Sequence, residues 1–172
     1  MNGRLPAEED QRTLTQAGDW VDEQLSRLTR ERFPEASFSI HMVRAWKEES
    51  SFVGNNRGPV VVTVPVNGKP TQLDITQEMR QACEALLPPI VESMLDLLSR
   101  VQPEYQERVR NNIILSGGTG LIRGLGPRLE QELAGFGGGK VKVVKDPIFV
   151  GSDGGLSIAL DAPDADWEKL TP

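Results

Sequence analysis

A glycine-rich turn is the strongest candidate for chemistry in this sequence. It follows residues 113–115, whose apolar, mostly β-branched side chains are typical of a buried parallel strand. The turn consists of Gly117, Gly118, Thr119 and Gly120. Because glycine has no Cβ, backbone N–H groups here can closely approach a phosphate or a base. The turn therefore indicates a nucleotide site, with an ordinary strand-to-helix turn as the alternative.

Three charged residues form a second candidate, on a helix predicted to begin near Ser39. Arg44, Lys47 and Glu48 are spaced i, i+3 and i+4, which places them on one face. Arginine and lysine can contact phosphate or base, and a glutamate can accept hydrogen bonds from ribose hydroxyls. A solvent-exposed face with an ion pair along the helix is the alternative interpretation.

Other polar residues favour structural roles. Asp19 and Asp22 could form a carboxylate pair, although Asp19 also fits the N-cap of a helix. His41 is the only histidine, so we predict neither a metal site nor a Cys–His pair. Cys83 lies between alanines on a predicted helix, which favours a small buried residue over a nucleophile.

A dinucleotide-binding fingerprint is the rival interpretation of the turn. Gly118, Gly120 and Gly124 form G-x-G-x-x-x-G, a near match to that motif. Such folds place the turn after their first strand, whereas 117 residues precede Gly118 here. Asp146 follows Gly120 by 26 residues, while the motif expects an acidic residue after about 20. Both spacings disfavour this interpretation.

The elements that must position these residues follow from apolar spacing and turn residues. Residues 1–12 are expected to be a flexible segment. The predicted elements are strands at 12–16, 113–115 and 141–144, a hairpin with strands at 59–66 and 71–75, and helices at 19–30, 39–50, 76–101 (broken at Pro88-Pro89), 103–110, 127–133 and 154–160. We expect Gly154-Gly155 to let the last helix pack closely on the sheet. The second half alternates strands and helices, which indicates an α/β fold with the hairpin inserted as a sub-lobe.

Composition excludes several classes of function. The 172 residues carry a net charge of −6, which argues against non-specific binding to nucleic acid. No window approaches the roughly 18 apolar residues of a membrane span, and residues 1–12 lack a signal-peptide core. A single cysteine fits a reducing compartment. We therefore expect a soluble, cytoplasmic protein.

Several segments resemble the actin-like ATPases, the family that includes actin and MreB. Ser116-Gly117-Gly118-Thr119 resembles the family's adenosine-binding turn, residues 44–48 its helix beside adenine and ribose, and residues 18–22 its bacterial G-D-x-x-D element. The resemblance extends over nearly the whole chain to the branch that forms magnetosome filaments. It includes the segments 14–18, 51–54, 82–86, 102–106, 122–125 and 144–147, together with Trp167.

The resemblance implies a partial actin-like, ribonuclease-H-like second lobe. Residues 13–36 and 76–172 would form subdomain IIA without its opening strands, and residues 37–75 an inserted subdomain IIB with the hairpin. Glu48 would hold the ribose of ATP or ADP, Arg44 and Lys47 would line the adenine side, and Gly117 to Gly120 would present backbone to the nucleoside.

The resemblance also implies a cytoskeletal role. The chain would be a component or modulator of filaments that align magnetosomes, with itself or full-length actin-like proteins as partners. A stand-alone adenine-nucleotide-binding domain is the alternative. The family's phosphate loops and catalytic residue correspond to positions before Met1, and no D-x-G-T turn occurs. We therefore expect a truncated protein without ATP hydrolysis of its own, and Mg²⁺ only if the missing half is supplied in trans.

Overall fold

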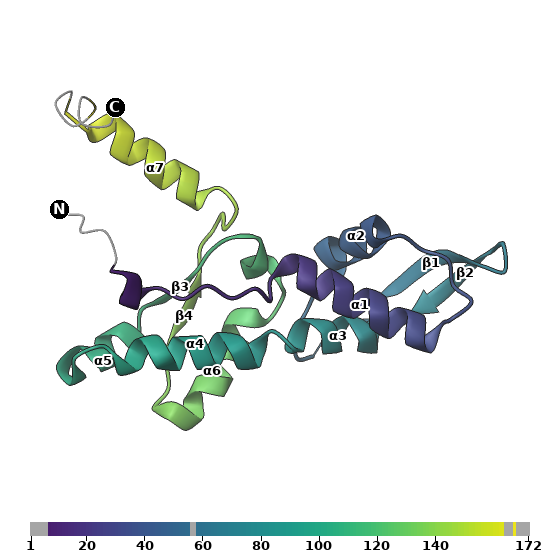
Figure 1. The fold of residues 1–172 in the computed structure, drawn as a ribbon, viewed down its shortest axis with the longest axis horizontal. Coiled ribbons are helices and arrows are strands. Elements are labelled where there is room, and N and C mark those ends of the chain that lie inside the picture. Colours follow the sequence, from purple (N-terminus) through teal and green to yellow (C-terminus); the bar gives the residue numbers. More distant parts are fainter. Residues whose placement is uncertain (1–6, 56–57, 164–166, 168–172) are drawn as a thin grey trace.

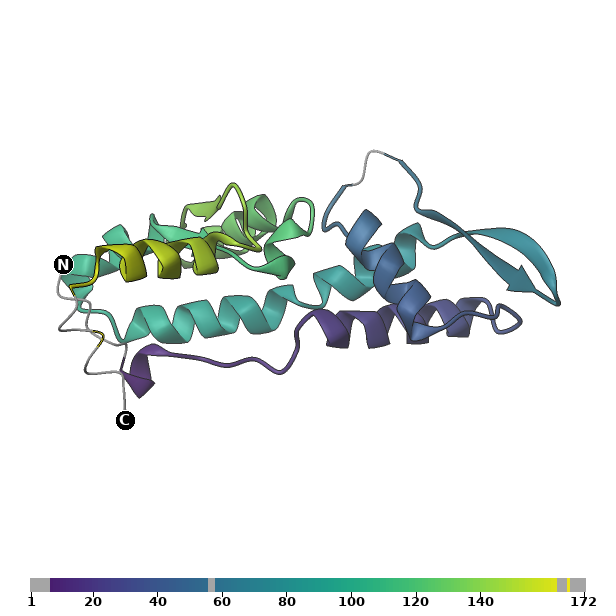
Figure 2. The same ribbon diagram turned by 90° about the horizontal axis from the view of Figure 1, so that it is seen from above.

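The computed structural model describes residues 7–55, 58–163 and 167. The molecule is elongated, and different elements occupy its two ends (Figures 1 and 2). One end contains α1 (Gly18–Arg32), α2 (Ile40–Ser50), α3 (Thr76–Glu84) and the strands β1 (Val61–Val66) and β2 (Lys69–Asp74). The other contains α4 (Leu87–Ser99), α5 (Pro103–Arg110), α6 (Leu125–Leu133), α7 (Val150–Asp161) and the strands β3 (Ile113–Leu115) and β4 (Val141–Val143). Short 3₁₀ helices are η1 (Glu8–Asp10), η2 (Gly118–Leu121) and η3 (Ala134–Phe136).

A continuous apolar core joins the two ends. Val21 and Leu25, one helical turn apart on α1, are completely buried, as is Val43 on α2. β1 alternates between exposed and buried positions, so that Val62 and Val64 face the core. In α6, the buried side chains recur at every fourth position, which directs one face of this helix inward.

The hairpin and the second helix are confirmed. β1 pairs with β2 in antiparallel register around Asn67 and Gly68, whose φ angles are 50° and 77°. Positive φ at both loop residues is typical of the tight turn that asparagine followed by glycine favours. Ser39 caps α2, because its side chain accepts a hydrogen bond from the backbone N of Met42 at 3.3 Å.

The expected break in the long helix is also confirmed. α3 ends at Glu84 and α4 begins at Leu87, so Pro88 and Pro89 fall in the first turn of α4. Proline is tolerated there because the first-turn N–H groups have no partner within the helix. The helix predicted at 103–110 is present with the same bounds.

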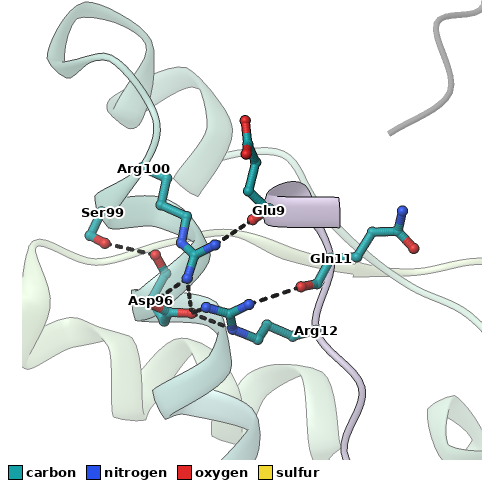
Figure 3. A network of polar contacts seen from close by, with 6 residues as sticks. All are labelled: Glu9, Gln11, Arg12, Asp96, Ser99 and Arg100. Carbon is teal, nitrogen blue, oxygen red and sulfur yellow. Dashed lines mark hydrogen bonds and ion pairs between the residues drawn. The ribbon is translucent and has the colours of Figure 1, made fainter. Parts of the chain in front are cut away.

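The strand predicted at 12–16 is wrong. Within the described residues, this segment forms no strand but runs extended beside α4 (Figures 1 and 3). Arg12 makes an ion pair with Asp96 of α4, and Arg100 donates to the carbonyl oxygen of Glu9 at 2.6 Å. Alternating side chains favour extended backbone, but a strand also needs a neighbouring strand, and side chains hold this segment instead. Residues 1–6 of the predicted flexible segment lie outside the described residues.

The second sheet is less buried than expected. β3 and β4 pair in parallel, with Ile113 opposite Val141, and α6 packs against β4. Ile114 is 60% exposed, however, so the prediction of a fully buried strand is wrong. In the described part of the chain this sheet has only two strands, and one of its faces is not covered.

The last helix does not pack closely on this sheet. α7 begins at Val150, earlier than predicted, and none of its residues is buried. A Cβ added to Gly154 or Gly155 would meet no atom within 4 Å, so the predicted role of this glycine pair is wrong. Figure 1 shows α7 projecting from the body. Its apolar side chains Leu156, Ile158 and Leu160 are exposed. Within the described ranges, no helix has the length and apolar character needed to cross a membrane.

Candidate functional site

A cavity of about 530 Å³ lies where α1, α2 and the glycine-rich turn meet. Small-molecule sites fall in the same range of volume, about 300–1,000 Å³. Its polar side combines Lys47 and Glu48 with Gly118 and Thr119. Segments about 70 residues apart in the sequence thus line one cavity. The remaining lining residues are Gly18, Val21, Ser51, Leu86, Leu121, Ile122 and Ile148.

The α2 wall of the cavity carries one anchored and one free charged group. The Lys47 ammonium lies 2.8 Å from a carboxylate oxygen of Asp22 and donates to the carbonyl of Gly18 at 3.0 Å. Glu48 is exposed and, among the described residues, makes no hydrogen bond or salt bridge. Its carboxylate can therefore accept hydrogen bonds from hydroxyl groups of a ligand.

Arg44 does not line this cavity. Its guanidinium donates to Asp22 at 3.2 Å and to Asp19 at 2.8 Å, both on α1. The pKa of Arg44 is raised, chiefly by the hydrogen bond to Asp22 and then by attraction to Asp19. The ion pairs of α2 thus run to another helix, and not along α2 as the alternative interpretation supposed. Asp19 is not an N-cap either, because α1 begins one residue earlier and its N-cap is Ala17.

The glycine-rich turn contributes only its middle to the cavity. Gly118 and Thr119 begin η2, so their backbone N–H groups have no partner within that helix. Gly117 donates its N–H to the carbonyl of Pro147, and Gly120 donates to that of Gly117. Gly120 is buried, and a Cβ there would come within 3.5 Å of the Pro147 side chain. Two of the predicted amides are therefore used within the protein.

Backbone pairing between distant segments holds the two walls together. An isolated bridge joins Phe52, just after α2, to Arg123, just after η2. The N–H of Val53 donates to the carbonyl of Arg123 at 2.9 Å, and the N–H of Arg123 donates to that of Ser51 at 3.2 Å. These bonds set the spacing between Ser51 and Ile122, which face the cavity.

Sequence reasoning missed the apolar wall. Leu86 lies at the bend between α3 and α4, and Ile148 follows β4. Neither position carries a local signal, because their place in the cavity depends on how distant elements pack. Gly18 and Val21 could have been found from the G-D-x-x-D segment, which was singled out for its aspartates.

Two residues with other potential chemistry lie outside the cavity. His41 is exposed on the first turn of α2. Cys83 is completely buried, and this burial raises the pKa of its thiol to about 11. A neutral, inaccessible thiol is unreactive, which agrees with the structural role predicted for Cys83.

A second cavity, of about 570 Å³, is the weaker candidate. It lies on the side of α3 and α6 and is lined mainly by polar residues, including Arg80, Glu84 and Arg128. Glu84 already accepts a hydrogen bond from the backbone N of Gly54, and Arg128 pairs with Glu132. The cavity beside Lys47 has the larger apolar wall, which a nucleobase needs.

Comparison with known proteins identifies the family. The Actin family profile matches residues 22–151. The chain belongs to the actin family. Over 170 residues, or 99% of the chain, it is 42% identical to the actin-like protein MamK of Paramagnetospirillum magneticum and 41% identical to that of Magnetospirillum gryphiswaldense. These alignments cover 49% and 47% of the relatives, so the chain spans about half of their length.

Solved structures of MamK have the same fold as this actin-family chain. A double helical MamK filament matches 94% of the chain and 50% of its own length, with a TM-score of 0.89 and 43% identity. A non-polymerising MamK mutant bound to AMPPNP matches 92% of the chain and 49% of its own length, with a TM-score of 0.86 and 43% identity. The prediction of a partial actin-like fold is confirmed.

Proposed function

We propose that this chain forms the nucleoside-binding wall of an actin-like ATP site. The single supporting observation is the cavity that places Lys47 and Glu48 of α2 beside Gly118 and Thr119 of η2. Glu48 accepts hydrogen bonds from the ribose hydroxyls, and the backbone N–H groups at the start of η2 donate to polar atoms of the nucleoside. Leu86 and Ile148 offer apolar contact to adenine.

Arg44 has a different role in this proposal than the sequence suggested. Its guanidinium is paired with Asp19 and Asp22, so it links α2 to α1 and does not line the adenine side. Lys47 donates to the Gly18 carbonyl and is paired with Asp22, and an ammonium with three donor hydrogens can also donate to a ligand. The proposed contacts with the nucleoside are therefore made by Lys47, Glu48, Gly118 and Thr119.

We propose that binding by these 172 residues alone occurs without hydrolysis. Phosphoryl transfer requires groups that position the γ-phosphate and Mg²⁺. Among the described residues that line the cavity, the single cation is Lys47, which is already paired with Asp22. Mg²⁺ and the phosphates would be held by the half of a MamK-like protein that these residues do not represent.

The cellular role proposed is that of a MamK-like cytoskeletal component. A MamK filament of known structure matches the chain along nearly its whole length. We propose that the chain associates with itself or with full-length relatives, in the cytoplasm along magnetosome-associated filaments. In this assignment residues 13–36 and 76–172 form subdomain IIA, and residues 37–75 form subdomain IIB.

Titration calorimetry with ATP, ADP and adenosine tests the binding proposal. A hydrogen bond to a charged group contributes about 1.5–3 kcal/mol, so Glu48→Gln is expected to weaken ATP binding about 10- to 150-fold. Glu49→Gln is the matched control, because Glu49 is the exposed neighbour outside the cavity. Equal affinity of Glu48→Gln and the wild type would refute the role of Glu48.

Co-sedimentation separates filament association from a stand-alone binding domain. The proposal expects the chain to pellet with polymerised full-length MamK, at a ratio that saturates. Binding of ATP without pelleting would favour the stand-alone domain. Phosphate release that depends on Mg²⁺ and exceeds the buffer rate would refute the expected lack of hydrolysis.

A further inference from the structure

The interface between α1 and α2 contains a buried carboxylate beside the cavity. Asp22 is 1% exposed, and its two oxygens face two cations of α2, Lys47 at 2.8 Å and Arg44 at 3.2 Å. A buried carboxylate is costly unless it is paired and hydrogen-bonded. The fold therefore needs a cation beside Asp22, and of its two cations Lys47 is the one that lines the cavity.

Among the described residues, the polar groups that contact the Lys47 ammonium both belong to α1. The Lys47 side chain is 14% exposed, and its ammonium contacts Asp22 and the carbonyl of Gly18, which lies one helical turn before Asp22. The contact with Gly18 is a hydrogen bond, whereas the contact with Asp22 is an ion pair whose geometry does not satisfy the Asp22 oxygen as a hydrogen-bond acceptor. Lys47 lines the cavity, so two groups of α1 hold an ammonium that faces the ligand site from α2.

The two aspartates of α1 differ in a way that allows a comparison. Within the described part of the chain, Asp19 pairs only with Arg44, and its side chain is 87% exposed. Solvent screens such a pair, and its contribution is small. Of the two aspartates, it is Asp22 that contacts Lys47, and Asp22 is shielded from solvent. Removing the charge of Asp22 or that of Asp19 thus separates the effect of the buried contact with Lys47 from that of the exposed contact with Arg44.

We propose that Asp22 is a positioning residue for the nucleoside, because it fixes the Lys47 ammonium at the cavity wall. Asp22, which does not itself line the cavity, then sets the position of the Lys47 side chain that does. This inference rests on the proposed function for the identity of the ligand. The position of Lys47, however, can be measured without any ligand.

The first test measures the reactivity of Lys47 in the free protein. Acetic anhydride labels accessible amines, and peptide mass spectrometry reports the rate at each lysine. Asp22→Asn is expected to raise the labelling rate of Lys47 several-fold, while Asp19→Asn leaves it unchanged. Lys69, which is exposed in the hairpin, is the internal reference. An unchanged Lys47 rate in Asp22→Asn would overturn the proposal.

The second test asks whether Asp22 acts on the ligand through Lys47. Asp22→Asn is expected to weaken ATP binding about tenfold in titration calorimetry, and Asp19→Asn less than twofold. On a Lys47→Met background, Asp22→Asn should cause no further loss, because the side chain that it positions is absent. An equal loss on both backgrounds would indicate a general structural role and overturn the proposal.

The two tests also separate this inference from the proposed function. If the wild type binds no ATP, the proposed function fails, while the labelling rates still decide whether Asp22 holds Lys47. Circular dichroism and urea unfolding confirm that each variant is folded before it is compared. Asparagine has nearly the shape of aspartate, so the packing between α1 and α2 is retained.

Discussion

Replacing Gly124 by alanine tests how the two walls of the cavity are joined. Gly124 precedes α6 with a φ of 80°, and a Cβ there would lie 2.8 Å from the carbonyl oxygen of Val53. That atom belongs to backbone, so the clash cannot be relieved by turning a side chain. The alanine must push the segment of Val53 away from the segment of Arg123, which are hydrogen-bonded to each other.

The expected loss of stability has two parts. An alanine in the left-handed region costs about 1–2 kcal/mol. Forcing a methyl group into a packed contact costs about 1–3 kcal/mol more. Gly124→Ala should therefore lower the free energy of unfolding by about 2–5 kcal/mol, a large share of the 5–15 kcal/mol typical of a folded protein.

Gly54→Ala is the matched control in urea unfolding followed by circular dichroism. Gly54 also has a left-handed φ, of 73°, but a Cβ there would meet no atom within 4 Å. Gly54→Ala should lower the free energy of unfolding only by the cost of the left-handed backbone, about 1–2 kcal/mol. ATP affinity should fall in Gly124→Ala, since the shifted segment carries Ser51. If the two variants unfold at the same urea concentration, the contact with Val53 is not the constraint described here.

Three further predictions concern separate parts of the molecule. Ser39→Ala removes the cap of α2 and should cost about 1 kcal/mol in urea unfolding; no change would mean that the hydrogen bond from Met42 contributes nothing. The native Cys83 thiol, with a pKa of about 11, should react with iodoacetamide at pH 8 only after unfolding, and rapid labelling of folded protein would contradict this. Because the thiol ionises at lower pH in the unfolded chain, the free energy of unfolding should fall as pH rises from about 9 towards 11. The pKa of Asp74 is lowered, chiefly by hydrogen bonds from Thr76, so stability should be lost as pH falls through the lowered value. Asp74→Asn should lessen that loss, which urea unfolding measured at a series of acidic pH values can check.

Local signals predicted most of the secondary structure. The cap at Ser39, the turn at Asn67-Gly68 and the break at Pro88 each depend on residues within a few positions of each other. The strands predicted at 113–115 and 141–144 do pair with each other, whereas the one predicted at 12–16 finds no neighbouring strand in the described chain. Side-chain alternation there indicated extended backbone correctly, but it could not supply a neighbouring strand.

The candidate site divides in the same way. Residue type, spacing and the family resemblance predicted four of the residues that line the cavity, namely Lys47, Glu48, Gly118 and Thr119. The sequence could not show that Arg44 turns to α1 or that Ile148 completes the apolar wall. These facts depend on helices and loops that pack together from distant parts of the chain.

By itself, the sequence determined which side chains share a face of α2 and where the backbone lacks a Cβ. These are properties of helical period and residue type, which neighbouring residues decide. Only the tertiary structure decided that Asp22, from another helix, holds Lys47 at the cavity. The partner of a carboxylate depends on its burial and on its distance from the nearest cations, and both are set when the helices pack.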